Sequence, residues 1–152
     1  MKSVIELEIN VRQADVAVLL ADPHRNPEWM DDIARIEAVG GVLGEPGSSY
    51  RLVPKRGSMI FVATVLARKL PDELRLSLDS PTASVTVEVR LLALSDRKTK
   101  LISEENFTFR GVFGKILGFL ARGAIKRAHR RHMEAFKRLV EGHLAARVSG
   151  RT

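Results

Sequence analysis

Six strand-like segments follow one another between residues 33 and 110, separated only by short turns. They are Ile33–Leu43, Ser48–Lys55, Met59–Leu70, Glu73–Asp79, Ala83–Leu94 and Lys98–Arg110. Turn-forming sequences rich in glycine, proline, serine and aspartate lie between them, as at Gly44-Glu45-Pro46-Gly47. Connections this short join neighbouring strands that run in opposite directions. The pattern therefore predicts an antiparallel meander.

A further strand and two short helices are predicted before the meander. Residues 5–11 alternate between apolar and polar side chains, which indicates a strand with one solvated face. Residues 14–21 lose this alternation and suit a short helix, which Asp22-Pro23 should end because a residue before proline avoids helical backbone angles. Asn26-Pro27 is typical of a helix cap followed by proline in the first turn, and predicts a second short helix through Trp29.

An antiparallel sheet with one solvated face must have its other face covered, and only residues 112–146 form an element long enough to do so. On a helical projection, apolar residues from Ile125 to Val140 share one arc and most of the basic residues lie opposite. The earlier apolar residues centre on a rotated arc, and Gly118 and Gly123 can allow a bend. We therefore predict an α+β fold: a curved antiparallel sheet of about seven strands around one long C-terminal helix, with two short helices after the first strand.

Length and composition narrow the class of protein. The 152 residues are enough for one domain with a real core, which we place at residues 1–147, followed by a short polar tail at 148–152. The absence of cysteine excludes disulfides, thiolate metal sites and cysteine nucleophiles. The first residues alternate and carry acids, which predicts a strand rather than a signal peptide. No apolar run approaches the roughly 20 residues that a membrane span needs, so we expect a cytoplasmic protein.

The net charge of +7 is distributed unevenly along the chain. Residues 1–114 carry a balance of −1, whereas residues 115–152 carry +8. The basic character therefore belongs to the C-terminal helix. Such a segment is either the solvated face of a long helix or a surface that attracts phosphates on lipid or nucleic acid. Nucleic acid is the less favoured partner, because the chain has eight aromatic residues and no basic run interleaved with them.

Four stretches of the sequence can be compared with known families: VAVLLADPHRNPEWMDDI, GEPGSSYRL, TKLISEENFTFRGVFGKILGFL and HMEAFKRLVEGHL. They resemble the SRPBCC superfamily, also called START-like or helix-grip, and within it the polyketide cyclase/dehydrase branch. These stretches occur in the family's order and cover nearly the whole chain. The resemblance implies an apolar cavity between the sheet and the long helix, and no fixed cofactor. The family includes cyclases, lipid carriers and quinone-binding proteins, so it implies a fold more closely than a function.

The last strand and the long helix carry the candidate polar residues. If Phe107 faces the cavity, the two-residue period of a strand places Ser103 and Glu105 there too. A carboxylate among phenylalanines has a raised pKa and suits proton transfer, unless it pairs with an arginine or a bulge turns it outward. On the helix, His129, His132 and His143 lie on the apolar arc, either as satisfied core histidines or as ligand contacts. A general acid/base couple results only if one of these histidines meets Glu105.

The predicted site combines these residues with the aromatic side chains around the expected cavity. Trp29 is expected either to pack the short helices against the long one or to close the cavity mouth, and the Tyr50 hydroxyl to lie in the pocket or at a strand edge. The candidate catalytic residues are Glu105 and His132. The candidate ligand-binding residues are Trp29, Tyr50, Phe61, Ser103, Phe107, Ile125, His129 and Phe136. We predict no metal site, because His129 and His132 lack a third ligand at suitable spacing.

Three functions fit this site. The favoured one is binding of a hydrophobic small molecule, such as a lipid, a quinone or a polyketide-like compound, by a monomer or a homodimer. The second is a cyclase/dehydrase-type enzyme that needs few catalytic groups, because folding a reactive substrate supplies much of the rate. The third is a module that binds an anionic membrane or a protein through the basic helix.

Overall fold

The computed structural model describes residues 1–149 and consists of a sheet, two short helices and one long helix. The elements, in chain order, are β1 (Lys2–Ile9), α1 (Gln13–Leu20), the 3₁₀ turn η1 (Pro23–Arg25), α2 (Asn26–Trp29), β2 (Ile33–Gly40), β3 (Ser49–Pro54), β4 (Phe61–Lys69), β5 (Glu73–Asp79), β6 (Ala83–Ser95), β7 (Lys98–Phe109) and α3 (Gly111–Ser149). The predicted fold class is confirmed. The predicted tail, 148–152, stays a prediction: α3 takes in residues 148–149, and residues 150–152 lie outside the described part of the chain.

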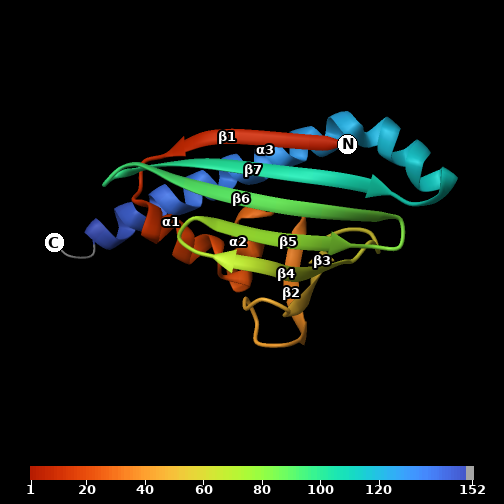
Figure 1. The fold of residues 1–152 in the computed structure, drawn as a ribbon, viewed down its shortest axis with the longest axis horizontal. Helices are drawn as coiled ribbons and strands as arrows, with labels where there is room; N and C mark the ends of the chain where they lie inside the picture. The colour runs from red at the N-terminus through yellow and green to blue at the C-terminus, as the bar shows by residue number, and fades with distance from the viewer. Residues whose placement is uncertain (150–152) are drawn as a thin grey trace.

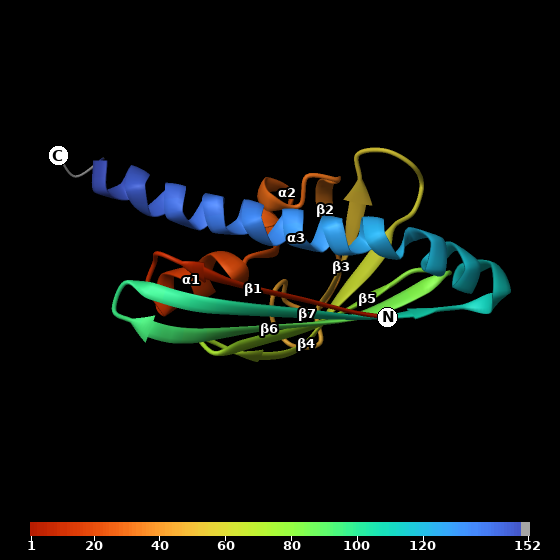
Figure 2. The same cartoon turned by 90° about the horizontal axis from the view of Figure 1, so that it is seen from above.

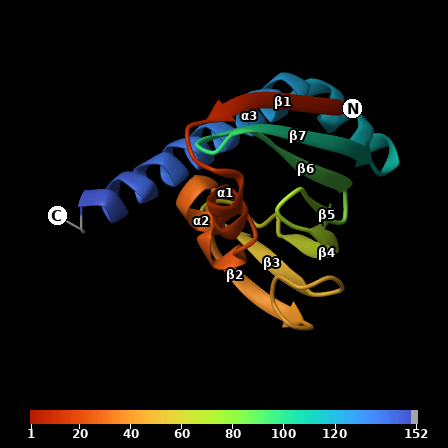
Figure 3. The same cartoon turned by 60° about the vertical axis from the view of Figure 1, so that its left-hand side comes forward.

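All seven strands form one antiparallel sheet with the order β1-β7-β6-β5-β4-β3-β2. The meander β2 to β7 pairs each strand with the next, and β1 adds to the far edge by pairing with β7. The sheet curves, and α3 lies along its concave side (Figures 1 and 2). Helices α1 and α2 close one side of the space between them (Figure 3). Two cavities lie between the sheet and the long helix in this arrangement.

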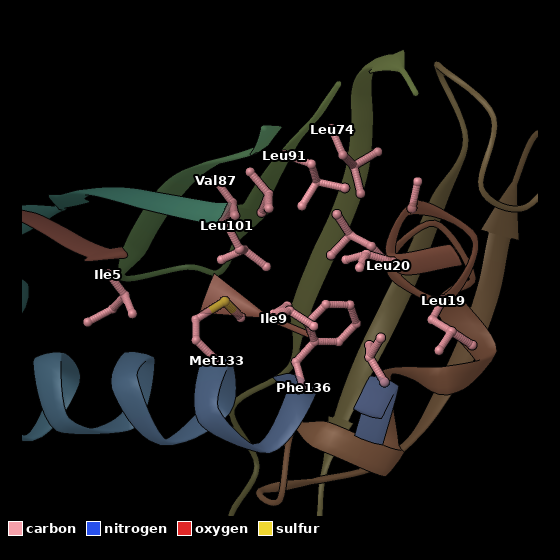
Figure 4. Packing of buried hydrophobic residues seen from close by; sticks show 14 of the residues in the cluster. Ile5, Ile9, Leu19, Leu20, Leu74, Val87, Leu91, Leu101, Met133 and Phe136 are labelled. Atoms are coloured by element: carbon pink, nitrogen blue, oxygen red, sulfur yellow. The ribbon is translucent and has the colours of Figure 1, made fainter. Parts of the chain in front are cut away.

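The hydrophobic core lies between α1, the concave face of the sheet and the C-terminal half of α3 (Figure 4). Met133, Phe136 and Val140 face the sheet from α3, and all three are buried. They meet Ile9 of β1 and Leu101 of β7, which are also buried. Successive turns of one helix face place these three side chains in a row against the pleated sheet. This contact fixes α3 on the sheet.

The outer face of the sheet carries polar side chains, as its alternation predicts. Arg75 lies between Glu73 and Glu88, with nitrogen–oxygen distances of 3.8 and 4.0 Å, and Arg90 also contacts Glu88. These groups are partly exposed, so each pair contributes little to stability, typically less than about 1 kcal/mol. These polar side chains make the outer face of the sheet a solvated surface. An apolar site is therefore expected on the concave face.

The cap of the second short helix differs from the prediction. Asn26 was expected to cap it, but the turn starts earlier, at Pro23, and the Asp22 carboxylate accepts a 3.0 Å hydrogen bond from the backbone N–H of His24. Asn26 instead lies within α2 with its side chain buried. Two prolines compete for the start of the helix, and the Asp-Pro pair with its own side-chain cap takes the first turn. Asn26 is thereby released to point toward the cavity.

The first turns of α3 differ from the rest of the helix. Figures 1 and 2 show them (cyan) bending away from the axis of the later turns, at the end of the molecule opposite the C terminus. Phe113, Leu117 and Leu120 are exposed there, so the rotated apolar arc seen in the sequence does not face the core. Among the described residues, no helix is both long enough and apolar enough to cross a bilayer.

Candidate functional site

Two adjoining cavities lie between the sheet and α3. The first is small, with a cavity volume of about 70 Å³, and is bordered by α1, α2 and the middle of the sheet. The second is larger, with a cavity volume of about 350 Å³, is partly open to solvent, and is bordered by the first turns of α3 and the ends of β6 and β7. Both are lined mainly by apolar side chains. Five residues belong to both linings: Met30, Leu52, Leu78, Glu105 and His132. The two predicted catalytic residues therefore lie where the cavities meet.

Strand β7 supplies the polar group at this junction. Its alternation places Ser103 and Glu105 on the concave face with Phe107, and Glu104 and Asn106 on the outer face. Burial raises the pKa of Glu105 to about 7, and the nearby His132 opposes the rise. The described residues give Glu105 no arginine partner, and the strand runs without a bulge through this position. Near neutral pH, Glu105 can both donate and accept a proton.

His129 is held by two serines from neighbouring strands. Its Nδ1 lies 2.8 Å from Oγ of Ser3 in β1, and its Nε2 lies 2.9 Å from Oγ of Ser103 in β7. Burial lowers the pKa of His129 to about 4, so the ring is neutral near pH 7. Its Nε2 is also 3.5 Å from the Glu105 carboxylate, but with a neutral ring this contact is not an ion pair. Both ring nitrogens are occupied, so His129 positions groups at the cavity wall and offers no free nitrogen to a ligand.

His132 borders both cavities and faces two exposed aspartates that follow α2. Its Nε2 lies 2.9 Å from Oδ1 of Asp32 and 3.5 Å from Oδ1 of Asp31, although the approach is out of line for a hydrogen bond. Arg131 binds Asp31 at 2.9 Å from the same helix. His132 and Arg131 hold the pKa of Asp32 below its ordinary value, and Arg131 does the same for Asp31. Both aspartates are exposed, and they join the end of α2 to α3.

The ligand atoms of Asp31, Asp32 and His132 lie within 4.8 Å of one another. Two carboxylates and an imidazole are a donor set that divalent ions accept. Both aspartates are exposed, however, and already paired with Arg131 or His132. The group is accounted for as a set of polar contacts between α3 and the turn after α2.

Trp29 and Tyr50 border the first cavity, where they were expected. Trp29 packs edge-on against Phe136 with ring centroids 5.4 Å apart, which joins α2 to the core side of α3. Its indole Nε1 is buried and has no hydrogen-bond partner among the described residues. The Tyr50 hydroxyl accepts a long 3.4 Å hydrogen bond from Asn26. A buried donor without a partner costs free energy, so this wall is suited to a molecule that carries an acceptor.

The other candidate residues divide between the second cavity and the core. Phe61, Phe107 and Ile125 border the second cavity. Phe136 is fully buried and is not among the residues bordering either cavity, so its side chain packs the core. His143 lies away from the junction, in a small cleft beside α1. Sequence reasoning did not select Met30, Leu52 and Leu78, which share the junction with Glu105. They are ordinary apolar positions of a turn and two strands, and no sequence signal separates them from the core.

The fold and the cavity define a START-like domain of the SRPBCC superfamily, in which a curved sheet grips one long helix around an apolar space. Within that class, the chain belongs to the family described as "Polyketide cyclase / dehydrase and lipid transport", whose model matches residues 2–141. Among curated proteins, none matches the sequence at a significant level.

Solved structures of the same architecture come from bacteria and a plant. A START superfamily protein from Mycobacterium smegmatis is 14% identical, with a TM-score of 0.70 over 95% of this chain and 97% of that one. The ZhuI aromatase/cyclase from a Streptomyces species is 17% identical, with a TM-score of 0.73 over 97% and 95%. Norcoclaurine synthase from Thalictrum flavum, solved with dopamine and hydroxybenzaldehyde, is 14% identical, with a TM-score of 0.68 over 94% and 88%. At these identities the similarity establishes the fold.

Proposed function

We propose that this protein binds a hydrophobic small molecule, of the lipid, quinone or polyketide-like class, in the space between the sheet and α3. The observation that carries the proposal is the pair of apolar cavities that meet at Glu105 and His132. Apolar cavities with a few polar groups at defined points are the usual form of small-molecule sites. The family description, which names both cyclases and lipid transport, supports the same class of ligand.

The polar groups of the site support a ligand that carries oxygen. The unpartnered Nε1 of Trp29 can donate to a carbonyl or hydroxyl oxygen in the first cavity. Glu105, with its pKa near 7, can donate when protonated or accept when ionised. Around them the walls are aliphatic and aromatic, which favours a largely hydrocarbon body. A hydroxylated or carbonyl-bearing apolar molecule fits both requirements.

A proton-transfer enzyme is the second candidate, and the environment of Glu105 favours it. A general acid/base works best when its pKa lies near the working pH, and burial places Glu105 there. In this reading, Glu105 moves a proton on a substrate held against the Trp29 wall. His129 stays neutral and keeps Ser103 and the local backbone in place. The aromatase/cyclase among the structural neighbours supports this candidate by fold alone.

Native mass spectrometry of the purified protein, with extraction and identification of any retained compound, tests ligand binding directly. Titration with the neutral apolar fluorophore N-phenylnaphthylamine then measures occupancy of the cavities. Ala128→Phe places a large side chain in the second cavity and should weaken binding about tenfold or more. Ala124→Phe adds the same side chain at an exposed position of the same helix and should leave binding unchanged. Equal affinity in both variants, with no compound retained, would count against the cavity as a binding site.

The enzyme candidate is separated from simple binding by Glu105→Gln. The amide keeps the size of the side chain but cannot exchange a proton near neutral pH. If the protein is an enzyme, turnover of an identified substrate should fall by about a hundredfold or more while probe binding is retained. If Glu105→Gln leaves turnover unchanged, Glu105 is not the catalytic group. If the bound compound is recovered unaltered from wild type and variant alike, simple binding is favoured.

A further inference from the structure

The first three turns of α3 expose an unusual amount of apolar surface. Val112, Phe113, Ile116, Leu117, Phe119 and Leu120, here named the apolar tip, are between 44% and 78% exposed. Single exposed apolar residues are normal in a folded protein, but a contiguous group of large ones marks an interaction surface. The tip lies at one end of the molecule (Figures 1 and 2). It is continuous along one helix, which presents its side chains as a single ridge.

The surroundings of the apolar tip are basic. Residues 110–131 contain seven Lys/Arg and no Asp/Glu. Four of these cations, Lys115, Arg122, Lys126 and Arg127, have no carboxylate partner among the described residues. The Arg122 guanidinium lies 4.1 Å above the Phe119 ring, so an apolar and a charged group share one spot of surface. The surface is therefore complementary to one that combines negative charge with apolar material.

The apolar tip also borders the open end of the second cavity. Leu117 and Gly118 line that cavity from α3, and Met59 lines it from the loop between β3 and β4. Met59 is half exposed, and the same loop carries the exposed cations Lys55 and Arg56. Both rims of the opening therefore combine apolar and basic side chains. A surface that contacts the apolar tip would therefore also face the opening of the second cavity.

We propose that the apolar tip and the β3–β4 loop dock on the surface of an anionic lipid bilayer, with the second cavity opening toward it. Helical segments with exposed large apolar residues and flanking cations bind in the interfacial layer of such membranes, through burial of the apolar side chains and attraction to lipid phosphates and carboxylates. The contact is peripheral, because no described helix can span a bilayer. That the cavity holds a hydrophobic ligand rests on the function proposed above, whereas docking on the bilayer does not depend on it.

Charge distinguishes the membrane from a second copy of the chain as the occupant. A two-fold dimer through the apolar tip would place the same surface on both sides of the interface. The unpartnered cations around the tip would then face their own counterparts, and like charges brought together oppose association. A bilayer with anionic headgroups supplies both the missing negative charge and an apolar layer beneath it. The observations therefore favour the bilayer.

Flotation with vesicles of phosphatidylcholine alone, or with about a third phosphatidylserine, tests docking in the absence of any cavity ligand. Binding should require phosphatidylserine and weaken as salt rises, because salt screens exposed charges. Leu120→Glu should weaken vesicle binding about tenfold or more, whereas Val18→Glu, which changes a residue of similar exposure on α1, should have little effect. Lys126→Glu should likewise weaken binding much more than Arg97→Glu, which makes the same charge change in the β6–β7 turn.

Three outcomes would overturn the proposal. One is no binding to phosphatidylserine vesicles at low salt. Another is an equal loss for Leu120→Glu and Val18→Glu. The third is a wild-type dimer that Leu120→Glu converts to a monomer without any change at vesicles, which would assign the tip to self-association. Ala128→Phe keeps this test separate from the proposed function: it should weaken probe uptake about tenfold or more and leave vesicle binding intact.

Discussion

Helix α3 is one continuous helix whose two ends lie in opposite environments. Toward the C terminus, Met133, Phe136 and Val140 are buried against the sheet and α1. Toward its start, Phe113 and Leu120 are exposed over a cavity that is open to solvent. The two ends of one element therefore differ in their structural part. The core end holds the fold together, and the open end borders the mouth of the second cavity.

The two ends of α3 should differ most in how much a substitution lowers the free energy of unfolding. Phe136→Ala removes a fully buried ring that Trp29 contacts edge-on, and should lower the free energy of unfolding by about 3–5 kcal/mol. Leu120→Ala removes a side chain that is 73% exposed and should change it by less than about 0.5 kcal/mol. Urea denaturation followed by tryptophan fluorescence or circular dichroism measures both. Similar losses in the two variants would mean that the open end also anchors the fold.

Two buried groups at the boundary between the two ends, Glu105 and His129, make the stability of the fold depend on pH in opposite directions. Glu105 keeps its proton in the folded state up to about pH 7, but the unfolded chain releases it near 4.5, so its contribution makes stability fall as pH rises between these values. His129 titrates near 4 when folded and near 6.5 when unfolded, so its contribution makes stability fall as pH drops through that interval. Each group changes the free energy of unfolding by about 3 kcal/mol across its interval, and the two changes largely cancel between pH 4.5 and 6.5.

Glu105→Gln removes one side of this balance. The variant should match the wild type below pH 4.5 and become more stable with rising pH, by up to about 3 kcal/mol above pH 7. Urea denaturation of both proteins across this range gives the difference, in which all other titrating groups cancel. A difference that does not vary with pH would show that Glu105 titrates as an ordinary surface carboxylate.

A smaller effect is expected from the glycines in the first turns of α3. A Cβ at Gly118 would lie 2.5 Å from the Phe109 ring, so Gly118→Ala must displace that ring or the helix, at a cost of about 1–3 kcal/mol. At Gly123 the new atom meets only the end of the Arg127 side chain, at 3.3 Å. Gly123→Ala should therefore stabilise the protein by about 0.5–1 kcal/mol through helix propensity. Thermal denaturation of the two alanine variants distinguishes a glycine required by close packing from one that only lowers helix propensity. An increase in stability in both variants would contradict close packing at Gly118.

The smallest effect should come from the surface contact between the middle of α3 and the turn that joins α2 to β2. Arg131 and Asp31 are 2.9 Å apart, but both side chains are about half exposed. Arg131→Ala should cost less than about 1 kcal/mol, and the loss should shrink in high salt. A double-mutant cycle with Asp31→Asn isolates the pair. A coupling well above that value would make this network a second anchor of the helix.

Periodicity along the chain was enough to predict the fold. The meander from β2 to β7 follows from strands separated by turns, and β5 has the predicted bounds, Glu73–Asp79. The same two-residue period placed Ser103, Glu105 and Phe107 on one face, and the structure has all three bordering the cavities. These properties are local: the residue types and their spacing within one element determine which face each side chain takes.

The rest depends on contacts between distant parts of the chain. His129 stood out on its helix, but its serine partners come from β1 and β7, and Ser3 is 126 residues away. Likewise, nothing in the local sequence around Asp31 and Asp32 indicates that His132 lies beside them. The apolar tip shows the same limit, since periodicity reveals an apolar arc but does not show whether another element covers it. Strand pairing and helix placement settle these questions, and both are properties of the whole fold.

The position of Glu105 on the boundary of two cavities has a consequence for length selection. A molecule of the class proposed above that occupied both spaces would have to pass this carboxyl, so its polar group would lie at a fixed point with one apolar arm on each side. One arm would end at the wall formed by α1 and α2, while the other would run toward the open mouth. The closed side would then limit the length of one arm, and the open side would tolerate variation in the other. Related compounds would be sorted by where their oxygen lies along the chain.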